Sequence, residues 1–111
     1  MDVNKVIIDK LRPYDIKENK VVFDRFEIED YTLKKIEELI ISVAQILDFD
    51  EEKSVLTVAV KAGSFNMHEA VLALIKEDGV IHLGAYASEG LISQHTSEKA
   101  IKRIKELLEK K

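Results

Sequence analysis

The chain has no cysteine and no tryptophan, and only one proline and four glycines among its 111 residues. Without cysteine it can form no disulfide, no thiolate zinc site and no cysteine nucleophile. No apolar run approaches the roughly 20 residues that span a bilayer. Charged residues interrupt the apolar positions of residues 1–11, so no signal peptide is expected. We therefore expect a cytoplasmic protein that does not bind membranes.

Basic residues are also in short supply, since 17 Lys and Arg face 21 Asp and Glu and the net charge is −4. Binding to nucleic-acid phosphates requires clustered Lys and Arg, so we expect no nucleic-acid partner. Hydrophobic residues make up 46% of the chain and charged residues 34%, which is typical of a folded globular protein. We expect residues 1–111 to form a single globular domain.

The N-terminal part predicts a helix followed by a hairpin. Apolar residues recur at helical spacing from Val3 to Leu11 behind Asp2, a suitable N-cap, and Pro13 ends the segment. Residues 14–17 and 20–28 are rich in β-formers, and the Glu18-Asn19 pair between them suits a turn.

Residues 31–47 predict a longer helix, because apolar residues recur every three or four positions over about four turns. Ile41 and Ile46 lie off the main apolar stripe. Two explanations are open: this helix contacts a second copy of the chain, or Ile41 is buried within one monomer.

Residues 55–86 predict a β-α-β unit. Residues 55–60 are β-branched and nearly uncharged, as in strands covered on both faces. Asn66 and Glu69 have capping-box spacing at the start of a helix that Asp78-Gly79 would end, and residues 80–86 supply the next strand. A right-handed crossover between the two strands would make them parallel neighbours.

A last helix is predicted over residues 97–111, with its apolar residues facing inward. The element order is then α-β-β-α-β-α-β-α. This order predicts an α/β or α+β domain with a four-stranded mixed sheet, a central β-α-β unit (55–86) and flanking helices.

The predicted crossover brings two polar loops to the same edge of the sheet, where open α/β sheets bind ligands. Two helix N-termini, near Asn66 and Thr96, would point toward this edge and favour an anion. The candidate ligand-binding residues are Lys61, Gly63, Ser64, Asn66, His68, Ser88, Gln94, His95 and Thr96. The alternative is structural: the glycines serve turns, and Asn66 and Thr96 or Ser97 are plain helix caps.

Motifs for metals and cofactors fail at specific positions. His68-Glu69 resembles the start of a metalloprotease helix, but Leu72 stands where the second histidine is needed. The acidic stretch from Asp48 resembles a calcium loop, but its sixth position is Lys53 instead of glycine. We expect neither a metal ion nor a cofactor.

The residues therefore favour a small protein that acts by binding rather than catalysis, as a homo-oligomer. It would engage a partner protein or a small anionic ligand, for example as an inhibitor or regulator. One alternative is an ester or phosphodiester hydrolase with His95 as general base and Glu89 and Ser88 nearby. Another is a structural subunit of an oligomer. The sequence leaves open whether any reaction is catalysed.

Overall fold

The structure, a computed structural model, describes residues 2–28, 31–62, 68–88 and 95–109. In these residues the helices and strands follow in the order α1 (Val3–Leu11), η1 (Arg12–Tyr14), η2 (Glu18–Lys20), β1 (Val22–Glu27), α2 (Leu33–Ile40), β2 (Ala44–Asp50), β3 (Val55–Ala62), β4 (His68–Glu77), β5 (Val80–Tyr86) and α3 (Thr96–Glu109).

The five strands form one sheet in the order β1-β5-β4-β3-β2, and every neighbouring pair is antiparallel. Strands β2 to β5 form a meander, and β1 joins the outer side of β5. The chain is thus an α+β domain with an all-antiparallel sheet. The predicted four-stranded mixed sheet with a central β-α-β unit is wrong.

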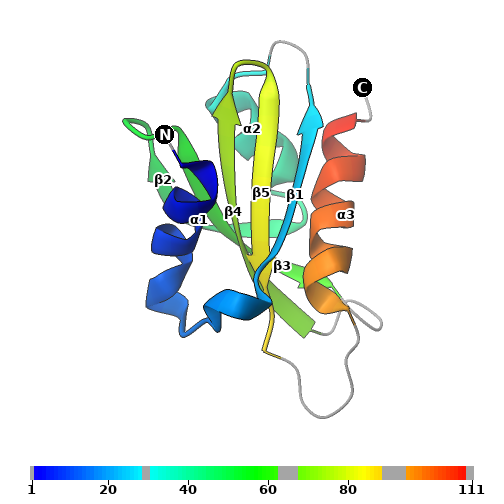
Figure 1. Cartoon of the computed structure of the whole chain (residues 1–111). Helices are drawn as coiled ribbons and strands as arrows, with labels where there is room; N and C mark the ends of the chain where they lie inside the picture. Colours follow the sequence, from blue (N-terminus) through cyan, green and yellow to red (C-terminus); the bar gives the residue numbers. More distant parts are fainter. Residues whose placement is uncertain (1, 29–30, 63–67, 89–94, 110–111) are drawn as a thin grey trace.

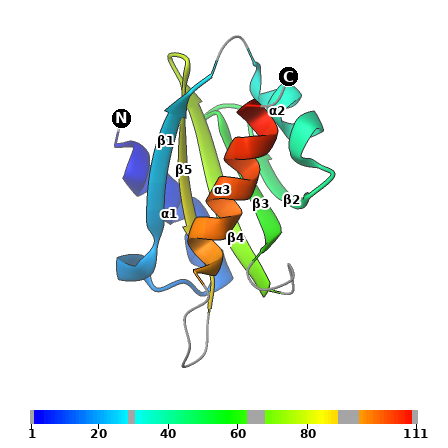
Figure 2. The same cartoon turned by 90° about the vertical axis from the view of Figure 1, so that its right-hand side faces the viewer.

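Helices cover both faces of the sheet. Helix α1 packs on one face, and α3 crosses the other face beside α2 (Figures 1 and 2). The core between the sheet and the α2 and α3 side includes Leu56, Leu72 and Ile104, and a smaller core on the α1 side includes Ile7 and Ile75. Alternate residues of the inner strands therefore enter different cores, so these strands show few polar positions.

The main correction concerns residues 66–77, which were predicted as a helix. Residues 68–77 form β4, the central strand, in which Leu72 and Leu74 face one core while Ala73 and Ile75 face the other. Because both faces are apolar, the period-two alternation is hidden, and Ala, Leu and Glu contribute helix propensity that packing overrides. Asp78 and Gly79 do not end a helix.

Asp78 and Gly79 instead connect β4 to β5 in a two-residue turn. Both have positive φ, at 51° and 77°. Two consecutive residues with positive φ define the type I′ turn, whose twist matches antiparallel strands and for which Asp-Gly is a preferred sequence. This turn makes β4 and β5 antiparallel neighbours, so the strands at residues 55–62 and 80–86 are separated by β4 and no crossover helix joins them.

The helix predicted over residues 31–47 is also too long. Helix α2 begins after the N-cap Thr32 and ends at Ile40, and residues 44–50 form the edge strand β2. The apolar residues of this stretch suit a strand as well: Ala44 fits both the helical stripe and a strand face, and Ile46, which lies off the helical stripe, shares that strand face. Ile41 lies just after the helix and its side chain is 64% exposed, so the structure does not bury it within one monomer.

The predicted hairpin over residues 14–28 is replaced by one strand. Residues 12–14 and 18–20 form short 3-10 helices, and only β1 pairs with the sheet. The other sequence-predicted elements are present: α1 with Asp2 as its N-cap, the strands predicted over residues 55–60 and 80–86, and the C-terminal helix as α3. The first of these strands extends to Ala62, and the end of the predicted helix, residues 110–111, lies outside the described residues.

Helix α1 lies close to β5 because position 84 has no side chain. A Cβ added to Gly84 would collide with Cγ2 of Ile7 and would lie 3.3 Å from the ring of Phe23. Ile7 is fully buried, and its branched side chain has little freedom to move away. Gly84 therefore sets the distance between α1 and the sheet.

We predict that Gly84→Ala lowers the free energy of unfolding by about 1–3 kcal/mol, the usual cost of overpacking a core. Urea unfolding measures this loss. In an Ile7→Ala background the colliding methyl group is absent, so the same substitution should cost at least about 0.5 kcal/mol less. An equal cost in both backgrounds would contradict the proposed contact.

The far end of α1 is held by an ion pair. The Nζ atom of Lys10 lies 2.7 Å from Oδ2 of Asp50 and 3.3 Å from Oδ2 of Asp48, both on β2. The hydrogen bond with Asp50 raises the pKa of Lys10. The same bond, with a second from the backbone N–H of Lys53, lowers the pKa of Asp50. The pair therefore contributes stability while both groups are charged.

We predict that Lys10→Met lowers the thermal unfolding midpoint near neutral pH. The difference from the parent should shrink as pH falls below about 4, because Asp50 then takes up a proton in the folded state and its contribution is lost. It should also shrink above about pH 10.5, as pH rises through the raised pKa of Lys10. Lys5→Met, on the same helix, is the control. A difference that does not change with pH would contradict this account.

Candidate functional site

The sequence-predicted ligand site falls at one end of the sheet. Strands β3 and β5 both run antiparallel to β4, so they point the same way although they are not neighbours. Their ends lie at the same end of the molecule as the start of α3 (Figure 1). The described candidates at this end are Lys61, His68, Ser88, His95 and Thr96. The other candidates, Gly63, Ser64, Asn66 and Gln94, lie outside the described residues, as does Glu89.

One of the two helix N-termini expected at this end is replaced by a strand, because the chain continues from residue 68 as β4. The second expected helix N-terminus, at the start of α3, is present, but the carboxylate of Glu98 already lies in its first turn. The Nδ1 atom of His95 lies 2.7 Å from Oε2 of Glu98, in the first turn of the helix. A carboxylate in the first turn interacts with the helix dipole as a bound anion would. This arrangement removes much of the support for an anion site.

A contact between α3 and β3 fixes the geometry of this end. Arg103, in the middle of α3, donates a hydrogen bond to the backbone carbonyl of Lys61 near the end of β3. His95, just before α3, has a φ of 54°, and its carbonyl accepts a hydrogen bond from the N–H of Lys99 at 2.9 Å. His95 thus starts the helix through its backbone and engages Glu98 through its ring.

A second candidate site lies on the opposite face, beside α1. Phe23 and Arg25 point from β1 to the α1 side of the sheet, since Phe26 enters the core on the other side. Arg25 is paired with His82 of β5, and Phe23 with Gly84. Together with the start of α1 they line an open depression of about 520 Å³. Its residues are Asp2, Val3, Asn4, Phe23, Asp24, Arg25 and His82.

The exposed aromatic ring is the unusual feature of this depression. Phe23 rests on Gly84 beside Ile7, yet 38% of the residue remains exposed. His82 is half-buried and Arg25 is exposed. A partly buried ring is held in place by the protein while its free face can still contact another molecule, so it suits a binding surface.

Both signs of charge surround this ring. Arg25 contributes a cation, His82 an imidazole ring and Asp2 a carboxylate. Asp24 also borders the depression, but it alternates with Phe23 and Arg25 and therefore leaves β1 on the opposite face. Asp2 accepts a hydrogen bond from the N–H of Lys5 at 3.2 Å, and Asp24 accepts one from the N–H of Arg25 at 2.8 Å. The carboxylates are therefore fixed parts of the surface. We call Asp2, Asn4, Phe23, Asp24, Arg25 and His82 the β1 surface.

Sequence reasoning missed the β1 surface because its members come from three separate elements. The alternation of Val22, Phe23, Asp24, Arg25 and Phe26 was a usable signal for one strand with an aromatic residue on each face. The pairing of β1 with β5, which brings His82 beside Arg25, joins residues about 60 positions apart and has no local signature.

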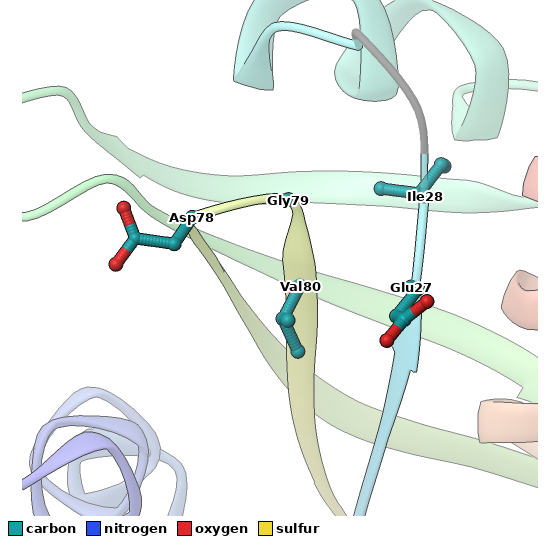
Figure 3. A pocket seen from close by; sticks show the side chains of 5 residues that line it. All are labelled: Glu27, Ile28, Asp78, Gly79 and Val80. Atoms are coloured by element: carbon teal, nitrogen blue, oxygen red, sulfur yellow. The ribbon is translucent and has the colours of Figure 1, made fainter.

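A third opening lies at the tip of the β4-β5 hairpin, lined by Glu27, Ile28, Asp78, Gly79 and Val80 (Figure 3). Its backbone is ordered by a hydrogen bond from the N–H of Ile28 to the carbonyl of Gly79, at 3.0 Å. The carboxylate of Asp78 points away from Glu27 (Figure 3), so the two acids do not converge on a common ligand. This opening carries no site.

The remaining features of the described residues add no further site. No helix in the described part of the chain is both long and apolar enough to cross a membrane. Nor do the described residues bring together three His, Asp or Glu side chains that could hold a metal ion. The chain matches no protein-family model, no characterised protein and no solved structure.

Proposed function

We propose that the protein acts by binding a partner protein through the β1 surface and catalyses no reaction there. The observation that carries this proposal is the position of Phe23. Its ring is anchored over Gly84, and the residue remains 38% exposed between Arg25 and the start of α1. Aromatic residues and Arg are the types most enriched in protein interfaces, where a few of them supply most of the binding energy.

The mixed charge of the β1 surface supports a protein partner over a small anion. An anion bound by Arg25 would lie among the same lining residues as the carboxylate of Asp2. A protein surface can offer a cation to Asp2 and a carboxylate to Arg25 at the same time. The depression is also wide and open, which suits a protein better than a small molecule that needs enclosure.

The lining of the depression supports binding over covalent catalysis. It includes no Ser, Thr, Lys or Tyr, and the chain has no cysteine, so the residues of the β1 surface offer no hydroxyl, thiol or amine nucleophile. An acidic composition without cysteine supports a cytoplasmic location, and the net charge of −4 supports a protein partner over nucleic acid. A role as an inhibitor or regulator is consistent with such a binding protein.

We predict that a photo-reactive p-benzoylphenylalanine at position 23 forms a covalent protein adduct in cells of the native host. The adduct should be lost when Arg25→Glu is added, because reversing this charge removes the match to the partner. The same probe at Tyr14, which is 36% exposed on η1, is the matched control and should give no adduct. Mass spectrometry identifies the linked protein. Equal labelling from both positions, or from neither, would contradict the proposal.

One observation favours the hydrolase alternative. The contact between Nδ1 of His95 and Glu98, at 2.7 Å, is the arrangement in which a carboxylate orients a histidine that acts as general base. The carboxylate in this contact is Glu98, and not the expected Glu89, which lies outside the described residues. Ser88 follows β5 at the same end of the sheet, so a nucleophile and a base share this region. The His95 side chain is 69% exposed, however, which gives little exclusion of water.

If this alternative holds, a panel of ester and phosphodiester substrates should show turnover that His95→Ala reduces at least about 100-fold, the usual contribution of a general base. Glu98→Gln should reduce turnover less, because the ring keeps a hydrogen-bond partner. His68→Ala is the matched control and should retain activity. Turnover that is absent, or insensitive to His95, would eliminate the alternative.

A further inference from the structure

The β1 surface is open on its outer side because β1 is an edge strand. Helix α1 borders the depression on the inner side, and β1 and β5 form its floor. Among the described strands none pairs with β1 on the side away from β5. An occupant that packs against Phe23 would therefore also reach past the edge of the sheet.

We propose that this occupant is a second copy of the same chain, related by a two-fold axis that passes near Phe23. The inference rests on the proposed function, because it names the partner of the same surface. Two-fold interfaces require a surface that is complementary to itself, since residue i contacts residue j and j contacts i. The β1 surface meets this requirement.

Its self-complementarity comes from carrying both signs of charge around an apolar centre. Arg25 of one copy can contact Asp2 of the other, and the symmetry generates the same contact again. The axis then lies between the Phe23 ring of one copy and the Phe23 ring of the other. The exposed faces of these two rings can stack with an offset. Each copy closes the open side of the other copy's depression with its own Phe23 and Arg25.

The copies are expected to meet through side chains and not by joining their sheets. The N–H of Arg25 donates to the carboxylate of Asp24 at 2.8 Å. Since β5 occupies the inner side of β1, we assign this contact to the outer edge, where it occupies a donor that an added strand would need. A two-fold pairing of β1 centred on Asp24 or Arg25 would also place like charges opposite each other. Both features oppose a continuous ten-stranded sheet.

The area required is available. A stable interface buries about 800 Å² on each partner, a small part of the 6802 Å² that the described residues expose. The depression alone is smaller than this, so the contact must extend over the neighbouring exposed side of α1. Ile41, the most exposed large hydrophobic residue among those that the structure describes, follows α2 on the other side of the sheet and offers the competing surface.

Sedimentation velocity of the purified protein over a concentration series tests the inference. We expect a dimer of twice 12.7 kDa whose dissociation constant rises at least tenfold in Phe23→Ser and in Arg25→Glu. Arg25→Lys, which keeps the charge, should have a smaller effect. Tyr14→Ser is the control of equal exposure and should leave the dimer unchanged. Circular dichroism of each variant confirms that it is folded.

Two results would overturn the inference. A protein that stays monomeric up to millimolar concentration has no self-association of the proposed kind. A dimer that Ile41→Ser dissociates and Phe23→Ser does not would place the interface on the α2 side. The cross-linking result then decides the proposed function separately: an adduct from position 23 to a different protein leaves that function standing, whereas no adduct from position 23 removes both.

Discussion

The structure depends on one constraint, which is that the middle of β4, residues 70–75, carries apolar side chains on both faces. Its residues alternate between two apolar cores, so the sheet must be covered by helices on both faces. Helix α3 spans the larger core beside α2, while the nine-residue α1 covers the other face together with Ile16 and Val21, which pack against the same core. Because Ile7 packs closely on Gly84, this short helix can bury the inner strands on its side of the sheet. Because α1 is short, it does not fully cover Phe23 of β1. The β1 surface is therefore a consequence of the limited area of the sheet that α1 covers.

Much of the secondary structure could be predicted where one signal dominated. The N-cap Asp2, the apolar runs at residues 55–60 and 80–86, and the apolar stripe of α3 each agree with packing, and each element is present. The prediction failed where both faces of a strand are buried. Residues 68–77 have helix-forming side chains and no visible alternation, and the sequence offered one contrary signal, Asp78-Gly79, which is also the preferred pair of a type I′ hairpin turn. Interpreting this pair as a helix stop produced the wrong strand order.

The candidate sites show the same limit. The position of Lys61, Ser88 and His95 at one end of the molecule follows from β3 and β5 running in the same direction, which the sequence argument required. The helix N-terminus near residue 66 that made this end attractive for an anion does not exist, because a local helix signal was outweighed by sheet pairing. The β1 surface depends on the register that places Arg25 opposite His82, and such long-range pairing leaves no periodic trace in the sequence.

The two sheet edges explain why association would use a face. At the β2 edge, a register shift between Ile46 and Asp48 breaks the ladder, and Asp48 and Asp50 are engaged by Lys10 of α1. At the β1 edge, the carboxylate of Asp24 takes a backbone donor. Bulges and charged side chains of this kind are how natural sheets prevent strand addition. An edge strand with these features can lie next to a partner protein without forming a continuous sheet with it. The side chains that project from the edge strand then determine which partner is accepted, and on the α1 side of β1 these are Phe23 and Arg25.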